Sequence, residues 1–291
     1  MEPKLPEVIR DPGELQRRLK VFKKEGKTIG LVPTMGALHY GHLSLAIAAK
    51  NDCDVTVVSV FVNPIQFAPN EDYDQYPRTL DADLELLSQI GVDFVFAPDP
   101  QQMYPRGFST GVHVGGPLTE VLEGSFRPTH FDGVATVVLK LFQVSMADVA
   151  YFGQKDFQQL AVVKHMVHDL NVPIEIIGCP IIREQDGLAM SSRNKYLDKK
   201  QRKDALVLYE SLTQAEYLIH SGQRNVEVIK ATIRSLIEAV PDTKIDYICV
   251  ADPETLREME TVAGNVVVLL AVRFGQTRLI DNMVIEPAPK N

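Results

Sequence analysis

The sequence has few cysteines and no spacing that would pair them. Its 291 residues include three, Cys53, Cys179 and Cys249, which are far apart and form no Cys-x-x-Cys motif. These features argue against a disulfide framework and against a cysteine-based zinc site. We expect each thiol to be reduced and to fill a gap in a hydrophobic core.

Long hydrophobic runs are also missing. The longest apolar run, Val266–Val272, is too short to span a bilayer. The N-terminal stretch up to Leu15 has no apolar segment of the kind found in signal peptides. Both absences favour a cytoplasmic protein.

Positive charge is not in excess. Lys and Arg number 30 against 38 Asp and Glu, so the formal net charge is -8. Broad nucleic-acid or membrane surfaces need the opposite balance. The composition, with 45% hydrophobic and 23% charged residues, is that of an ordinary soluble globular protein. It is compatible with an enzyme that has a local basic pocket.

The first two-thirds of the chain alternates β-branched runs with helical patterns, without an internal repeat. The predicted strands are Thr28–Val32, Asp54–Val62, Val92–Ala97, Val149–Phe152 and Ile174–Gly178. The predicted helices are His42–Lys50, Leu80–Ile90, Gly133–Val144 and Phe157–Leu170. This alternation predicts an α/β fold with a doubly wound, parallel, Rossmann-like sheet. Ligands of such sheets bind at the carboxyl ends of the strands.

The composition shifts near Pro180. Two helices and three strands are predicted beyond it, at Asp198–Ser221, Val226–Ala239, Ile245–Ala251, Asn265–Val272 and Arg278–Glu286. Helices followed by consecutive strands indicate a smaller α+β domain. We therefore expect one domain at 1–180 and a smaller C-terminal domain at 181–291.

A first candidate site follows the first of these strands. Two glycines, Gly36 and Gly41, permit close approach of the backbone to a ligand. His39 and His42 are three residues apart near a helix N-terminus, where neutral imidazoles can donate hydrogen bonds to phosphate oxygens. Two alternatives are a loop with ordinary hydrogen bonds and half of a metal site. The pair His165 and His168 has the same spacing, and we interpret it as a coincidence on a helix surface.

The wider frame distinguishes His39 and His42 from that pair. It reads Pro-Thr-Met-Gly-x-x-His-x-Gly-His over residues 33–42, on a strand–loop–helix. His-x-Gly-His resembles the HIGH signature of the nucleotidyltransferase superfamily, which includes the class I aminoacyl-tRNA synthetases. A motif gains weight from such a structural context.

Two further segments also lie at predicted strand ends. Asn63 and Gln66 carry neutral amides that can bind hydroxyls and orient a carboxylate, although Asn-Pro alone is more often a plain turn. In Tyr151–Gln159, Lys155 can stabilise the charge of ATP phosphates during transfer. The alternatives there are a solvated lysine and a helix N-cap at Asp156.

A fourth segment, Asp186–Asn194, lies just past the predicted domain boundary. Ser191, Ser192 and Arg193 supply two hydroxyls and a guanidinium fork, which suit a phosphate. Taken in isolation, a pair of helix-capping serines is about as common. At this place a mobile element can close over a nucleotide.

Together, in this order, the four segments resemble the pantothenate synthetase (pantoate–β-alanine ligase) family. The resemblance covers nearly the whole chain and includes the blocks Asp72–Arg78 and Leu122–Gly133. It implies that 1–180 binds the nucleotide and pantoate and that 181–291 acts as a lid. One position departs from the commonest form, because Gln154 stands where Glu is frequent.

The resemblance also implies a role for individual residues. His42, as proton donor, would be catalytic together with His39, Lys155 and Arg193. The ATP-binding residues would be Met35, Gly36, Ala37, Leu38, His39, Tyr40, Gly41, His42, Gly153, Gln154, Lys155, Asp156, Ile182, Met190, Ser191, Ser192 and Arg193. The pantoate and β-alanine site would include Gln66, Gln159 and Asn63.

The implied reaction converts ATP, pantoate and β-alanine into pantothenate, AMP and pyrophosphate, with Mg as cofactor and a homodimer as the active form. The metal ligands stay unassigned. The acidic residues Asp72, Asp74, Asp81 and Asp83 can include a Mg ligand, but a solvated loop and helix start is the simpler interpretation.

Two other functions remain open from the residues alone. One is a different nucleotidyltransferase, although the acidic composition and the absence of an anticodon-binding module argue against a tRNA substrate. The other is a non-enzymatic, nucleotide-binding regulatory module, against which the intact His, Lys, Ser and Arg positions argue.

Overall fold

The computed structural model describes residues 4–69 and 71–287. They divide into two compact units. The first unit lies within Met1–Gln154 and Gln159–Pro180, and the second within Lys155–Gln158 and Ile181–Asn291. The chain therefore passes from one unit to the other three times, and each unit is described by itself.

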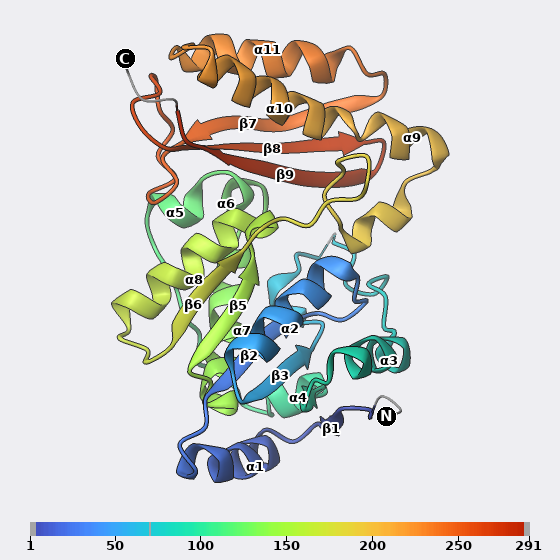
Figure 1. The fold of residues 1–291 in the computed structure, drawn as a ribbon, viewed down its shortest axis with the longest axis vertical. Helices are drawn as coiled ribbons and strands as arrows, with labels where there is room; N and C mark the ends of the chain where they lie inside the picture. Colours follow the sequence, from blue (N-terminus) through green and yellow to red (C-terminus); the bar gives the residue numbers. More distant parts are fainter. Residues whose placement is uncertain (1–3, 70, 288–291) are drawn as a thin grey trace. The chain divides into compact units, whose positions relative to one another are not determined.

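A parallel six-stranded sheet organises the first unit (Figure 1). Its order is β1-β4-β3-β2-β5-β6 and every neighbouring pair is parallel. The strands are β1 (Glu7–Ile9), β2 (Ile29–Thr34), β3 (Val55–Val60), β4 (Phe94–Phe96), β5 (Val149–Gly153) and β6 (Glu175–Cys179). This confirms the predicted doubly wound α/β sheet.

Helices cover both faces of this sheet. The longer ones are α1 (Pro12–Lys24), α2 (Tyr40–Asp52), α3 (Leu80–Ile90), α7 (His130–Ser145) and α8 (Phe157–Asp169), of which α8 begins in the second unit. Short helices are α4 (Pro100–Met103), α5 (Pro117–Glu120), α6 (Glu123–Phe126) and the 3-10 turns η1 (Pro64–Gln66) and η2 (Gln154–Asp156), of which η2 continues into the second unit.

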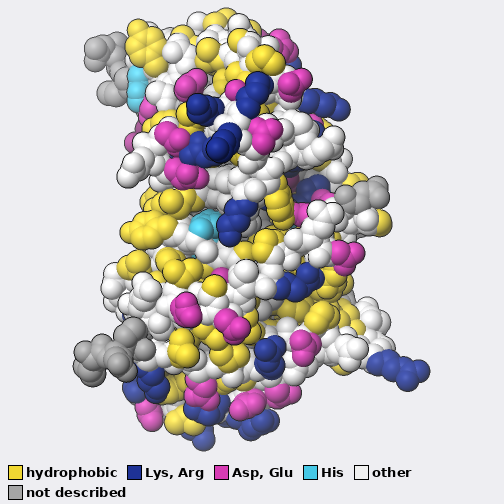
Figure 2. All heavy atoms as spheres, turned by 90° about the vertical axis from the view of Figure 1, so that its right-hand side faces the viewer, with side chains coloured by type: hydrophobic (Ala, Val, Ile, Leu, Met, Phe, Trp, Pro, Cys, Tyr) yellow, Lys and Arg dark blue, Asp and Glu magenta, His cyan; other side chains and the backbone are white. Residues whose placement is uncertain are grey.

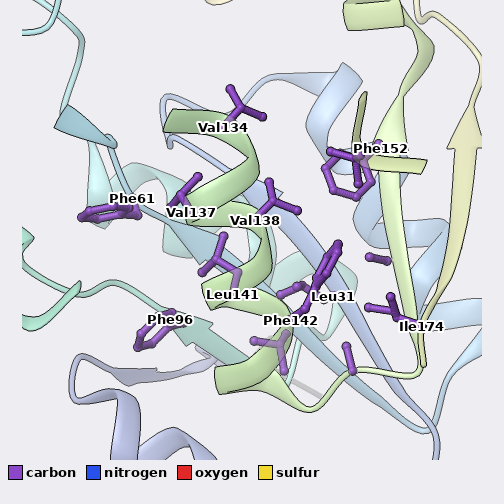
Figure 3. Packing of buried hydrophobic residues seen from close by; sticks show 14 of the residues in the cluster. Leu31, Phe61, Phe96, Val134, Val137, Val138, Leu141, Phe142, Phe152 and Ile174 are labelled. Carbon is purple, nitrogen blue, oxygen red and sulfur yellow. The ribbon is translucent and has the colours of Figure 1, made fainter. Parts of the chain in front are cut away.

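Alternation along the strands creates two cores in the first unit. Leu31 and Val57 pack into a cluster with α1 and α7, whereas their neighbours Val32 and Val58 pack into a cluster with α2 and α3. Because successive strand side chains point to opposite faces, a strand buried on both faces is a continuous apolar run. Figure 3 shows side chains of α7 packed in the first of these clusters.

The second unit has an antiparallel sheet of three strands in the order β7-β8-β9. They are β7 (Thr243–Ala251), β8 (Val266–Phe274) and β9 (Thr277–Ile285). Its helices are α9 (Lys199–Asp204), α10 (Val207–His220), α11 (Val226–Glu238) and the 3-10 helix η3 (Ser192–Tyr196). Ile229, Ile233 and Ile237 recur at helical spacing on α11 and pack into one separate core.

Some features differ from the sequence predictions. The helix predicted at Asp198–Ser221 is two helices, because Leu206 N–H bonds to Lys203 and Leu208 N–H to Ala205, three residues back, which tightens the chain there. Strand β1 and helix α1 were not predicted. The N-terminus of α1 does carry a signal, since the Asp11 carboxylate caps it by accepting from Glu14 N–H at 2.7 Å.

No helix in the described part of the chain is long and apolar enough to cross a membrane. On the face drawn in Figure 2, acidic and basic side chains are interspersed. This mixture agrees with the moderate net charge of -8.

Candidate functional site

A tight turn connects β2 to α2 in the first unit. Gly36 has a φ of +81°, and a Cβ there would lie 2.9 Å from Val60 Cγ1, so only glycine fits. Thr34 at the end of β2 accepts from Gly36 N–H at 3.1 Å and donates to the Ser59 carbonyl at 2.6 Å. The turn is thereby fixed to the end of β3.

The buried carboxylate of Asp83, in the first turn of α3, holds the next two residues of the turn. Its Oδ2 accepts from Ala37 N–H at 3.0 Å and its Oδ1 from Leu38 N–H at 2.8 Å. Ala37 has a φ of +51°, unusual for a residue with a side chain. Asp83 is 1% exposed, so the prediction that it lies on a solvated helix start was wrong. Since both amides are bonded to Asp83, this turn offers a phosphate chiefly its histidines.

His39 and His42 form a reciprocal cap on α2. The Nδ1 of His39 accepts from Gly41 N–H at 3.2 Å, and the Nδ1 of His42 accepts from His39 N–H at 3.4 Å. The ring centroids are 4.1 Å apart. An imidazole that accepts at Nδ1 carries its proton on Nε2 when neutral. Both rings therefore make their backbone contacts through Nδ1.

Gln66 lies close to this turn and is held by Asn63. Asn63 Nδ2 donates to Gln66 Oε1 at 2.9 Å and to the Gly133 carbonyl at 3.1 Å. Tyr104 donates to Asn63 Oδ1 at 2.7 Å, and burial raises the pKa of Tyr104 so that its hydroxyl keeps the proton. Gln66 Nε2 contacts Met35 Sδ at 3.3 Å. The first and second motifs thus meet, and Asn63 orients Gln66.

A buried histidine that sequence reasoning did not single out supports the backbone of Gln66. His130 Nδ1 lies 2.8 Å from the Gln66 carbonyl, and its Nε2 lies 3.0 Å from Arg127 Nη1. Burial, aided by the charge of Arg127, lowers the pKa of His130 to about 4. The neutral ring therefore donates through Nδ1 to Gln66 and accepts from Arg127 at Nε2.

Arg127 is in turn paired with Glu71. Its Nη2 donates to Glu71 Oε2 at 2.8 Å. Burial by itself would raise the pKa of Glu71, but the hydrogen bonds and charge of Arg127 outweigh it and lower the pKa. Arg127 and His130 both belong to the Leu122–Gly133 block. The sequence therefore marked this block as part of the family resemblance but did not show that it contacts Glu71 and Gln66.

The third motif is divided between the units. Gly153, Gln154 and the half-buried Gln159 belong to the first unit, while Lys155 and Asp156 belong to the second. The Lys155 side chain is 20% exposed, with its Nζ 3.9 Å from Asp156 Oδ1. Its backbone carbonyl accepts from Asn282 Nδ2 at 2.9 Å.

A short hairpin in the second unit carries the fourth motif. Met190 N–H donates to the Ile182 carbonyl at 2.9 Å, and Glu184 N–H donates to Leu188 at 2.8 Å. Ser191 then caps η3 by accepting from Arg193 N–H at 3.3 Å. The helix-capping interpretation of this serine is therefore correct, and a role in phosphate binding would be additional.

The described residues contain no group of three or more His, Cys, Asp or Glu side chains that could hold a metal ion. His165 and His168 both contact Asp169 on α8, with side chains 52% and 87% exposed. This agrees with the interpretation of that pair as surface residues. The three cysteines are free and buried, as expected.

Known proteins match nearly the whole chain. The model of the pantoate-beta-alanine ligase family matches residues 7–284. The pantothenate synthetase of Caldicellulosiruptor saccharolyticus is 55% identical over 273 residues, which cover 94% of this chain and 97% of that protein. The pantothenate synthetase of Moorella thermoacetica is 52% identical over 280 residues, which cover 96% of this chain and 99% of the relative.

Solved structures are similar over the same length. Pantothenate synthetase from Thermus thermophilus has a TM-score of 0.92 and 45% identity, with 97% of this chain and all 100% of that chain covered. Pantoate-beta-alanine ligase from Francisella tularensis, complexed with beta-gamma ATP and beta-alanine, has a TM-score of 0.80 and 36% identity, with 98% and 100% covered. The matches therefore extend over the segments of both units.

Proposed function

The chain belongs to the pantoate-beta-alanine ligase family, and we propose that the segments described above are its ATP and pantoate sites. The enzyme is an ATP-dependent ligase that forms the amide bond between pantoate and β-alanine. Matches at 55% identity over nearly full length decide against a different nucleotidyltransferase.

The observation that carries the site proposal is the cap formed by His39 and His42. Both Nδ1 atoms accept backbone hydrogen bonds at the carboxyl end of β2, so both rings are held at the edge of the sheet where ligands of such folds bind. An ATP phosphate placed there would meet two imidazoles at a helix N-terminus. Gln66, joined to this turn through Met35, would hold pantoate beside them.

The proposed chemistry has two steps. An oxygen of the pantoate carboxylate attacks the α-phosphorus of ATP, the bond to the bridging oxygen breaks, and pyrophosphate leaves. The resulting pantoyl-adenylate has AMP as a good leaving group. The neutral amine of β-alanine then attacks the acyl carbon, the acyl C–O bond breaks, and the amine loses its proton as AMP departs. No protein nucleophile is needed.

The protein would act in the first step by electrostatics and positioning. Two anions must approach, and donors already fixed in place reduce the cost of that approach. We assign this role to His39, His42, Lys155 and Arg193, with His42 as proton donor to the phosphates. Ser191 and Ser192 would add short hydroxyl donors. Gln66 and Gln159 would hold pantoate, with Asn63 orienting Gln66.

The other residues that the sequence predicts to bind ATP would form the rest of the nucleotide site. They are Met35, Gly36, Ala37, Leu38, Tyr40, Gly41, Gly153, Gln154, Asp156, Ile182 and Met190. Ala37 and Leu38 are buried and their amides are bonded to Asp83, so their contribution would be to shape the turn.

Mg is proposed to enter with ATP. It prefers phosphate oxygens and water to all-protein cages, and the described residues supply no acidic cluster of their own. The protein would therefore contribute no direct ligand to the ion. A homodimer and a cytoplasmic location are further proposals, which rest on the family and on the sequence.

Omitting substrates one at a time tests the function. With ATP and pantoate alone, the enzyme should release pyrophosphate in a burst of about one per site, as expected for an intermediate that accumulates. Steady AMP release should require β-alanine as well. ATP binding without a pantoate-dependent burst would favour the regulatory module.

Lys155→Ala tests the site assignment in the same assay. It should lower the rate of the pyrophosphate burst by on the order of 10²-fold, as for loss of an electrostatic donor. The matched control is Lys164→Ala, which removes an exposed lysine from α8. An unchanged burst in Lys155→Ala would refute the assignment.

A further inference from the structure

Asp281, in the middle of strand β9, fixes the hairpin that leads to Ser191–Arg193. Its Oδ2 and Oδ1 accept from Nη1 and Nη2 of Arg183 at 2.7 and 3.0 Å. A bidentate pair fixes the orientation of a guanidinium as well as its distance. Asp281 is 2% exposed, so little water competes for this pair.

Arg183 passes this constraint to the tip of the hairpin. Its Nη1 also donates to the Gly187 carbonyl at 3.1 Å, and its guanidinium lies 4.6 Å from the ring centroid of Tyr209. A Cβ on Gly187 would lie 2.1 Å from the same ring. The tip is therefore packed closely against Tyr209, and the hairpin has little freedom to shift.

Asn282, the next residue on β9, holds the other candidate phosphate-binding segment. Its Nδ2 donates to the backbone carbonyl of Lys155 at 2.9 Å, across 127 residues of sequence. Asn282 is 3% exposed. The bond fixes the backbone from which the Lys155 ammonium extends.

Both residues stand on a rigid support. Asp281 is opposite Leu270 and Asn282 is opposite Leu269 in β8, the central strand of the sheet. Groups anchored on strands keep their positions better than groups on loops. Two segments far apart in the sequence thus share one anchor.

We propose that Asp281 and Asn282 are positioning residues for the triphosphate of ATP. Asp281 acts through Arg183 on the hairpin before Ser191–Arg193, and Asn282 acts on Lys155. The inference rests on the proposed role of Lys155 and Arg193 in phosphate binding. Neither positioning residue needs to touch the nucleotide.

This role predicts a selective defect. A Lys155 backbone without its anchor would leave the ammonium free to sample positions away from the β- and γ-phosphates, and such misplacement weakens binding. AMP lacks those phosphates, so its Kd should hardly change. The ratio of the Kd for ATP to the Kd for AMP therefore separates positioning from a general loss of folding.

Asn282→Ala and Asn282→Leu are the test variants. Both remove the donor to Lys155. Leu fills the space that Ala would leave empty, so a variant that unfolds because of a cavity can be replaced by the other. Isothermal titration of the full chain with ATP and with AMP should show ATP binding weakened by on the order of 10-fold. AMP binding should change less than about twofold. Asp281→Asn should have the same selectivity.

Leu279→Ala is the matched control. Leu279 lies on the same strand, is 6% exposed and packs in the core of the second unit. Its truncation should lower thermal stability without moving the ATP-to-AMP ratio. The inference is overturned if Leu279→Ala moves the ratio as Asn282→Ala does.

Lys155→Ala separates this inference from the proposed function. If it raises the ratio while the Asn282 variants do not, Lys155 binds phosphate without help from β9, and only the inference fails. If Lys155→Ala itself leaves the ratio unchanged, the site assignment fails and the inference fails with it.

Discussion

At the scale of single residues, the state of one proton decides how Gln66 is held. His130 has an environment that favours the neutral ring, because it is buried and Arg127 lies 3.0 Å from its Nε2. A second proton at Nε2 would face that guanidinium and remove the acceptor that Arg127 uses. The neutral ring of His130 therefore donates to the backbone carbonyl of Gln66 while its Nε2 accepts from Arg127.

This environment predicts a pH-dependent stability. The pKa of His130 is about 4 in the folded protein, against an ordinary value of 6.5. Above 6.5 neither state binds the proton, and below it the unfolded chain does so first. The free energy of unfolding should therefore fall between pH 6.5 and 4, by up to about 3 kcal/mol from this group. His130→Asn keeps an amide donor near the Nδ1 position but does not titrate.

Urea unfolding of the wild type and His130→Asn at several pH values measures the effect. The variant should be less stable at pH 7.5, and the difference should shrink towards pH 4.5. His113→Asn, at a side chain 75% exposed, is the matched control and should not show this convergence. Parallel stability curves for the wild type and His130→Asn would contradict the account.

At the scale of elements, helix α3 shapes the start of helix α2. Asp83 projects from the first turn of α3 and binds two successive amides of the turn after β2. Those amides include the one of Ala37, whose positive φ is costly without support. The histidine cap thus depends on a carboxylate from an element 46 residues away.

Asp83→Asn should disturb that start with almost no change in volume. Two amide donors need two acceptor oxygens, whereas Asn has one oxygen and an NH2 group that would face an N–H. We expect the KM for ATP to rise by on the order of 10-fold, with a smaller change in the KM for β-alanine. Steady-state kinetics in each substrate measures both.

Ser88→Ala provides the comparison on the same helix. Ser88 is also buried, and its hydroxyl donates to the Glu85 carbonyl at 2.7 Å within α3. It should leave both KM values close to those of the wild type. An equal rise in both KM values for Asp83→Asn would mean that the helix, and not the turn, was disturbed.

Local patterns predicted most elements but not their supports. The apolar runs revealed the central strands, and α3 was predicted with the bounds that it has. The three-residue strand β1 was missed because it pairs with β4, far along the chain, and has no pattern of its own. The loops that carry the motifs could also be predicted, because glycines and capping residues determine the backbone conformation of their own neighbours.

The contacts that position the candidate site are non-local. His130 reaches Gln66 across 64 residues, and Arg183 reaches Asp281 across 98. No local sequence pattern indicates contacts between residues so far apart in the chain. A sequence can therefore suggest candidate side chains for the chemistry, but it does not show the distant residues that position them.

At the scale of the whole molecule, the two units have separate hydrophobic cores. The clusters on the two faces of the parallel sheet contain residues of the first unit, and the cluster around α11 contains residues of the second. Proteins often open in cooperative parts of this kind. The second unit should therefore be able to open while the parallel sheet keeps its hydrogen bonds.

Ile233→Ala tests this independence. Ile233 is 0% exposed at the centre of the α11 core, and its truncation should cost about 2–5 kcal/mol. Hydrogen exchange followed by mass spectrometry should show faster exchange in α10, α11 and β7–β9. Peptides from β2, β3 and α7 should keep their protection, because their core is intact.

Two matched variants complete this test. Val228→Ala, on the same helix but 43% exposed, should change exchange very little. Leu141→Ala, in α7 and 4% exposed, should produce the opposite pattern, with losses in the first unit. If Ile233→Ala and Leu141→Ala instead raise exchange equally in both units, the chain opens only as one cooperative body. The candidate ATP-binding segments of the second unit would then be no freer to move than the central sheet, and the expectation that this unit acts as a lid would lose its physical basis.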